Sequence, residues 1–259
     1  MDRTLAPASF PIKKFNFRNY RKIKLNGHID GLVILDKRHP ICSLEIIFRS
    51  GSWFEKNPGI AFLTGKMILE GTNSKNGEEI ALAFEYMGAN IEIQTTVDDS
   101  RIRLFATQKH IHSGLVLLRE ILFSPSFPEY EFEVIKNLKA KQIKTQLAKN
   151  NYFASSYFNQ LLFGKHHPYG RYLKEKEILK RSLSEIKKFF QLQFQNDPKV
   201  VLCGDIDDNI IEKTALLLNI VNKNGQQMSH SKIRPNYDHQ TIERSDSVQA
   251  SLRLGAQTI

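Results

Sequence analysis

Residues 50–72, SGSWFEKNPGIAFLTGKMILEGT, decide how this chain folds. The residues before them, 43–49, are apolar at every second position, which predicts a half-buried strand. Gly and Pro residues then interrupt that pattern. After them, apolar residues recur at helical spacing, at Ile60, Leu63 and Met67. The stretch therefore predicts a strand, a tight loop and a short helix over 58–69 that turns one face to a core.

A second stripe runs along the same expected helix. Phe62, Gly65 and Lys66 are spaced i, i+3 and i+4, the spacing at which side chains of one helical face converge on a point. An aromatic ring, a bare backbone and a cation include neither a metal ligand nor a general base. The stripe therefore has the geometry of a functional site without the side chains that metal chemistry needs.

The frame GSWFEKNPGIAFLTGKMILEGT resembles the signature of the pitrilysin and insulinase superfamily of zinc metallopeptidases, which includes the mitochondrial processing peptidases. In active members the matching helix carries His-x-x-Glu-His, in which two imidazoles hold zinc and the Glu takes a proton from the metal-bound water. The resemblance places the first His at Phe62, the Glu at Gly65 and the second His at Lys66. It therefore implies a zinc-free member with no catalytic residue, no metal ligand and no cofactor in this chain.

The resemblance also implies the place of the family's third zinc ligand, a Glu on a later helix. We expect that helix over 128–149, where Gln142 stands 76 residues after Lys66, at the ligand position. The apolar residues Ile135 and Leu138 predict that Gln142 lies on the inward face. An amide is a weak zinc ligand beside a carboxylate. We hypothesise that Lys66 supplies positive charge in place of zinc and that its ammonium bonds Gln142 and a nearby carboxylate.

Residues 90–106 predict a β-hairpin, because two alternating runs flank a polar turn. The segment GANIEIQTTVDDSRIRL resembles the family's edge strand, which in active members pairs with an extended substrate. The family's Asn-Ala falls on Glu92 and Ile93. The resemblance makes these two the candidate substrate-binding residues, and an ordinary sheet strand is the alternative.

Composition bounds the class of protein. The chain has 259 residues, of which 41% are hydrophobic, so it can bury the core of one domain or of one and a half. No run reaches the ~18 apolar residues of a membrane span, and the N-terminus lacks the apolar core of a signal peptide. Cys42 and Cys203 lie in apolar runs and predict buried free thiols. We therefore expect a protein without a membrane partner in the cytoplasm.

The formal net charge of +10 is the one anomaly of composition. Basic proteins can bind nucleic acid, but here the lysines are spread out, without interleaved aromatics or a Gly-rich cradle. We interpret them as solvated helix faces, with a docking surface for an acidic partner as the alternative. His110, His112 and the pair at 166–167 lack further ligands nearby and are interpreted as structural.

The fold we expect is α+β: a mixed, mostly antiparallel sheet with helices packed on one face, as the resemblance implies. We expect an extended arm over 1–20, a first domain over 21–221 and a polar linker over 222–246. Residues 247–259 alternate again and resemble the first strand of a second, homologous domain that is truncated here.

Three hypotheses of function follow. The first, implied by the resemblance, is a non-catalytic homologue that binds peptide and pairs with an active zinc peptidase subunit, or with itself, and binds no nucleic acid. Zinc would then be held by the active partner. The second is a zinc endopeptidase with relocated ligands, which predicts stoichiometric zinc. The third is a basic module for nucleic acid or an anionic partner, which predicts binding that weakens steeply with salt.

Overall fold

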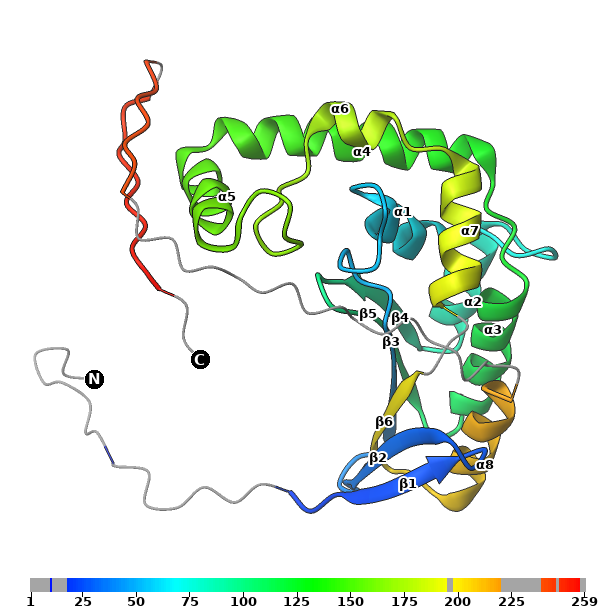
Figure 1. Cartoon of the computed structure of the whole chain (residues 1–259). Coiled ribbons are helices and arrows are strands. Elements are labelled where there is room, and N and C mark those ends of the chain that lie inside the picture. The colour runs from blue at the N-terminus through cyan, green and yellow to red at the C-terminus, as the bar shows by residue number, and fades with distance from the viewer. Residues whose placement is uncertain (1–9, 11–17, 195–197, 220–238, 246, 257–259) are drawn as a thin grey trace, which may run out of the picture.

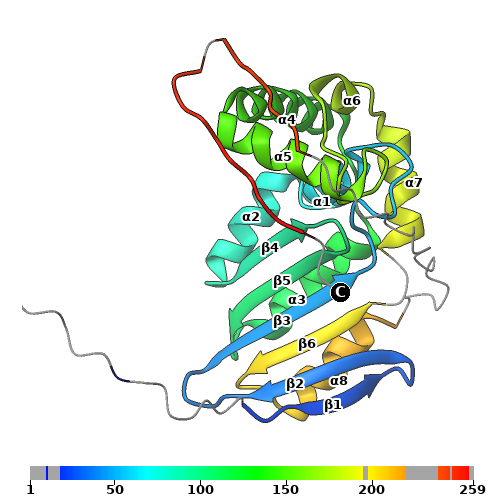
Figure 2. The same cartoon turned by 60° about the vertical axis from the view of Figure 1, so that its left-hand side comes forward.

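The computed structural model describes residues 10, 18–194, 198–219, 239–245 and 247–256. Within them, six strands form one sheet in the order β1-β2-β6-β3-β5-β4 (Figure 2). The strands are β1 (Arg21–Leu25), β2 (Ile29–Leu35), β3 (Ile41–Phe48), β4 (Asn90–Thr95), β5 (Ser100–Thr107) and β6 (Lys199–Gly204). β2 and β6 are parallel and every other pair is antiparallel. The expected mixed, mostly antiparallel sheet is confirmed.

Helices cover one face of this sheet and extend past its β4 edge (Figures 1 and 2). The described helices are α1 (Ile60–Met67), α2 (Gly77–Tyr86), α3 (Ile111–Phe123), α4 (Glu129–Ala148), α5 (Asn150–Phe163), α6 (Glu175–Leu179), α7 (Leu183–Gln193) and α8 (Asp208–Leu217). α2, α3 and α8 lie against the covered face, which is the right-hand side of the sheet in Figure 1 and its far side in Figure 2, while α1, α4, α5 and α6 lie toward and beyond the β4 edge. The edge strand β4 is therefore bordered by helices on one side.

The core lies between the sheet and the helices behind it. The central strand β3 places Leu44 between Leu104 and Leu202, and it places Ile46 between Ile102 and Val200. All six side chains are at most 1% exposed. Removing so much apolar surface from water is the main stabilising term of the sheet.

The sequence predicted most element positions. The hairpin expected over 90–106 is confirmed by the antiparallel strands β4 and β5, and the turn between β1 and β2 is made by Asn26 and Gly27 with positive φ, 50° and 74°. The helix expected over 58–69 spans 60–67, because Gly59 before it adopts φ 93°. A Cβ there would stand 2.5 Å from Ile178 Cδ1, so glycine also permits close packing.

The cysteine prediction is half right. Both thiols are free and Cys42 is buried, but Cys203 is only half-buried. Successive strand residues point to opposite faces, and Leu202 occupies the core side, so Cys203 faces the open side of the sheet. Burial and the charge of Asp205 raise the pKa of Cys42 to about 11.

The expected end segments lie largely outside the described residues. The arm over 1–20 is described only at 10 and 18–20, and the linker over 222–246 only from 239 to 245. Residues 247–256 form neither helix nor strand and lie along α5, where Arg253 Nε donates to Ser155 Oγ at 2.9 Å. Their assignment to a second domain stays a prediction.

Candidate functional site

Two of the four positions, Phe62 and Gln142, are joined by a residue that sequence reasoning missed. Phe62 lies on α1 and Gln142 on α4. Between them stands Lys139, whose Nζ lies 4.0 Å from the centroid of the Phe62 ring and donates to Gln142 Oε1 at 3.1 Å. A cation over an aromatic face is attracted by the ring's electrons. The structure thus joins the first and third ligand positions by a cation–π contact and one hydrogen bond.

Lys66, at the position of the family's second His, lies near Lys139 but does not make the hydrogen bond to Gln142 that we hypothesised. Lys66 is exposed and its side chain makes no hydrogen bond within the described part of the chain, so the proposed bond to Gln142 is wrong. Its charge still acts on Lys139: the pKa of Lys139 is lowered, first by burial and then by the Lys66 cation. The ammonium at the replaced site is that of Lys139.

The prediction that Gln142 faces inward is also wrong. Gln142 is exposed, and Leu138 is 60% exposed. The buried face of α4 is made instead by Phe132, Lys136, Ala140 and Ile143. The buried Lys136 breaks the apolar pattern of this face: its ammonium lies 4.8 Å from the centroid of the Phe132 ring and bonds Glu133 Oε1 at 2.5 Å. The pair of Lys139 and Gln142, three residues apart on one helix, was the signal that the sequence offered.

Gly65, at the position of the family's general base, is in close contact with the edge strand. A Cβ at this residue would stand 2.4 Å from Thr95 Oγ1 and 3.6 Å from Ile93 Cγ2. The Thr95 hydroxyl is itself fixed by a 3.0 Å hydrogen bond to Ser100 Oγ. Any side chain at position 65 therefore forces β4 or Thr95 to move.

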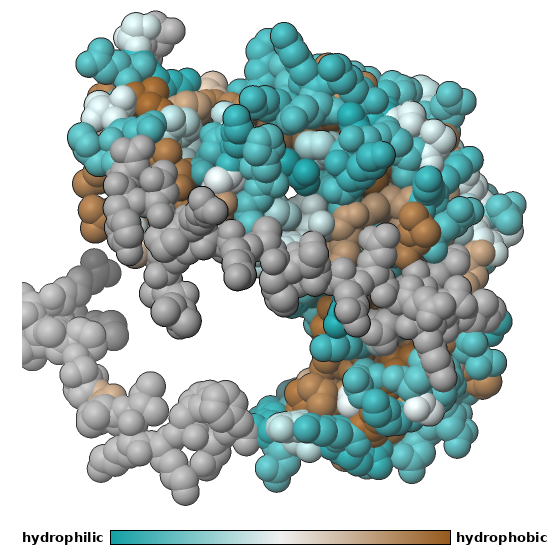
Figure 3. All heavy atoms as spheres, viewed as in Figure 1, coloured by the Kyte–Doolittle hydropathy of each residue, from teal (hydrophilic) through white to brown (hydrophobic). Residues whose placement is uncertain are grey.

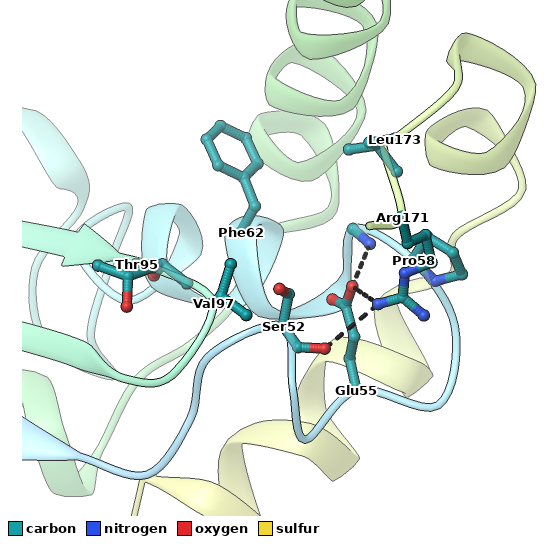
Figure 4. A pocket seen from close by; sticks show the side chains of 10 residues that line it. Ser52, Glu55, Pro58, Phe62, Thr95, Val97, Arg171 and Leu173 are labelled. Carbon is teal, nitrogen blue, oxygen red and sulfur yellow. Dashed lines mark hydrogen bonds and ion pairs between the residues drawn. The ribbon is translucent and has the colours of Figure 1, made fainter. Parts of the chain in front are cut away.

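The N-terminal end of α1 is held by a buried carboxylate. The side chain of Glu55 is 3% exposed, and it accepts hydrogen bonds from the backbone N–H groups of Gly59 at 3.1 Å and Ala61 at 2.9 Å. Arg171 Nη2 donates to Glu55 Oε1 at 2.6 Å and to the carbonyl of Ser52 at 3.2 Å (Figure 4). A carboxylate here satisfies the free N–H groups of the first turn.

Burial raises the pKa of Glu55, while the N–H groups of Ala61 and Gly59 and the charge of Arg171 act in the opposite direction. A buried charge is tolerated only when it is paired and hydrogen-bonded. Glu55 has both kinds of partner, so we assign it a structural role in positioning α1.

A small cavity lies between this network and the edge strand. Its volume is about 290 Å³, and it is lined by Ser52, Glu55, Pro58, Gly59, Phe62, Thr95, Thr96, Val97, Arg171 and Leu173. In Figure 4, Phe62 projects away from the ion pair of Glu55 and Arg171. The cavity thus connects the replaced motif on α1 to the end of β4.

The far wall of the cavity comes from the loop after α5, which aromatic contacts fix in place. His167 is buried, and its ring centroid lies 5.1 Å from that of Trp53 and 5.7 Å from that of Phe163. Tyr169 donates its hydroxyl to Asp98 Oδ2 at 2.5 Å, which raises the pKa of Tyr169 to about 12. These contacts agree with a structural role for His167.

Glu92 and Ile93 both lie on β4, at the end of the sheet order. Ile93 is half-buried and faces Gly65, whereas Glu92 is 58% exposed and stands 3.7 Å from Arg103 Nη1. Within the described residues, β4 pairs with β5 alone, so its second edge has free backbone groups there. The candidate residues are therefore placed where a further strand could add.

The outer helices form a polar surface. Hydrophilic side chains cover the upper part of the molecule in Figure 3, where α4 and α6 lie in Figure 1.

Among the described residues, no group of three or more His, Cys, Asp or Glu side chains could hold a metal ion. No helix of the described part is long and apolar enough to cross a membrane.

An α+β domain with a replaced zinc motif on a short buried helix defines a peptidase-like half-fold. A sequence model of the family described as Insulinase (Peptidase family M16) matches residues 32–163, and the chain therefore belongs to that family. The resemblance seen at residues 50–72 is confirmed. Within that family, the resemblance places the positions of the zinc motif at Phe62, Gly65 and Lys66.

Two curated relatives match most of this chain. A protein named non-peptidase homolog YmxG, from Helicobacter pylori (strain ATCC 700392 / 26695), is 28% identical over 193 residues, covering 72% of this chain and 44% of that protein. A protein named uncharacterized zinc protease YmxG, from Bacillus subtilis (strain 168), is 22% identical over 200 residues, covering 76% and 48%. The chain thus spans about half the length of these relatives.

Two solved structures share the fold. The peptidase M16 inactive domain from Pseudomonas fluorescens superposes with a TM-score of 0.74 at 24% identity, covering 84% of this chain and 54% of that one. A protease from Helicobacter pylori superposes with a TM-score of 0.71 at 18% identity, covering 85% and 55%. Both confirm the expected half-fold.

Proposed function

We propose that this chain is a non-catalytic member of the M16 family that binds extended peptides and pairs with a zinc-bearing M16 subunit. The main support for the proposal is the kind of residue that stands at the positions of the family's zinc motif. Lys139 and Gln142 bond each other over Phe62, and Gly65 is in contact with Thr95. These residues offer zinc an amide and cations rather than imidazoles and a carboxylate, so they do not fit the ion.

Peptide binding is supported by the position of β4. An extended peptide can add to a strand with free N–H and C=O groups, which supply affinity without regard to side chains. β4 has such an edge within the described residues, and it lies against the helix that carries the replaced motif. Cleavage of a peptide held there requires a catalytic centre on another polypeptide, and the zinc belongs to that partner.

The test has two parts. A tagged copy is purified from cells that produce it, and the co-purifying proteins are screened for intact His-x-x-Glu-His. Peptide cleavage is then measured for the pair, for each protein alone and after addition of a chelator. We expect chelator-sensitive cleavage by the pair and none by this chain alone.

Cleavage by this chain alone, with stoichiometric zinc, contradicts the proposal and supports the alternative of relocated ligands. If the chain binds peptide and associates with itself, but no zinc-bearing protein co-purifies, pairing with an active subunit is contradicted. The chain then acts as a homo-oligomer.

A further inference from the structure

Phe62 and Lys66 stand one turn apart on α1, and Lys139 Nζ lies 4.0 Å from the centroid of the Phe62 ring, so the two lysines converge on one place. Lys66 on α1 and Lys139 on α4 are near enough for the charge of Lys66 to lower the pKa of Lys139. Neither forms an ion pair among the described residues. The charge of Lys66 acts on the pKa of Glu70, again without an ion pair. Two like charges held close together destabilise each other, so the site favours an anion.

This cationic pair adjoins both the cavity and the edge strand. Lys139 covers Phe62, which lines the cavity together with Thr95 of β4. The other charged groups of the cavity, Glu55 and Arg171, are bonded to each other at 2.6 Å and offset each other. The remaining cations beside the cavity are therefore Lys66 and Lys139, with Glu70 as the acidic neighbour of Lys66.

We propose that Lys66 and Lys139 bind a carboxylate of an extended peptide that lies along β4. The inference rests on the peptide binding proposed above and adds the class of ligand that this site selects. Two ammonium groups supply donors to both oxygens of one carboxylate, and Gln142 already orients the Lys139 ammonium at 3.1 Å. The carboxylate comes either from an Asp or Glu side chain or from the C-terminus of the peptide.

Binding of matched peptides to the purified chain tests the inference. The first probes are octapeptides of alternating Ser and Val, acetylated, amidated and labelled with a neutral fluorophore, with one Glu or one Gln placed at each position in turn. A further probe has the Gln sequence and a free C-terminal carboxylate. Fluorescence anisotropy reports the affinity. We expect the best Glu peptide, or the free-acid peptide, to bind about tenfold more tightly than its neutral counterpart.

Variants separate this site from the general basic charge. Lys139→Met and the double variant Lys66→Met/Lys139→Met are expected to remove the preference for the carboxylate while retaining binding of the Gln peptide. Lys144→Met removes the same charge from an exposed position of α4 and is expected to keep the preference.

The outcomes are distinguishable. If Glu and Gln peptides and the free-acid peptide bind equally, the carboxylate site is overturned and peptide binding stands. If Lys144→Met removes the preference as fully as Lys139→Met does, the selection comes from overall charge and the site is overturned. If no peptide binds, both the site and the proposed peptide binding fail.

Discussion

The N-terminal end of α1 and its outer face are built in opposite ways. At the N-terminal end, Glu55 is buried and accepts hydrogen bonds from two backbone N–H groups and from Arg171. On the outer face, Phe62, Gly65 and Lys66 stand where the family places its ligands and base, and Lys66 is exposed without a hydrogen bond in the described part of the chain. The contrast teaches that the contacts that hold this helix in place are separate from the residues at the family's motif positions.

Removing Arg171 should have the largest effect, because it strands a buried carboxylate. We expect Arg171→Met to lower the free energy of unfolding by about 3 to 5 kcal/mol, measured by urea denaturation at pH 8. The double variant Glu55→Gln/Arg171→Met should be less destabilised than Arg171→Met, since no charge is left unpaired. Equal stability of Arg171→Met and the parent would break the comparison.

The same variant should regain stability in acid. Burial raises the pKa of Glu55, and losing Arg171 raises it further. Between the unfolded and folded pKa values the native state holds a proton that the unfolded state has released, so the free energy of unfolding rises as pH falls. The deficit of Arg171→Met relative to the parent should therefore shrink from pH 8 to pH 5. A deficit that is constant with pH would indicate lost packing instead.

Filling Gly65 should have the next largest effect. Its Cβ would stand 2.4 Å from Thr95 Oγ1, so we expect Gly65→Ala to cost about 1 to 3 kcal/mol by thermal or urea unfolding. In a Thr95→Ala background the same change should cost much less, because the contacting atom is gone. An increase in stability, as the helix propensity of Ala alone predicts, would show that β4 does not restrain α1.

Lys139, the cation that α4 places over the Phe62 ring, should contribute little to stability. Lys139→Met loses a cation–π contact and a hydrogen bond, but it also relieves desolvation and the repulsion from Lys66. We expect its melting behaviour to match that of Lys144→Met, with a change of at most about 1 kcal/mol. A loss of unfolding free energy as large as that of Arg171→Met would show that the contacts of Lys139 and of Arg171 stabilise the fold equally.

The smallest effect is expected on the edge strand. Glu92 is 58% exposed and stands 3.7 Å from Arg103, so Glu92→Gln should change the free energy of unfolding by less than about 0.5 kcal/mol. Urea denaturation of the two proteins side by side measures this. A larger loss would show that the position of β4 depends on this ion pair.

The sequence predicted where strands and helices lie better than it predicted which face of a helix is buried. The period of two along 43–49 and the two alternating runs over 90–106 identified strands correctly, because both depend on local residues. The face of α4 was wrong, since a buried lysine there breaks the apolar pattern. The network of Glu55 and Arg171 joins residues 116 apart in the sequence, a distance that local patterns cannot bridge.

The central claim is that this chain holds no catalytic zinc of its own. The most direct measurement is the zinc content of the purified chain after dialysis against excess zinc and then metal-free buffer, by plasma mass spectrometry. We predict far less than one zinc ion per chain, and no change on Phe62→Ala or Lys66→Ala. One tightly held zinc ion per chain would contradict the account.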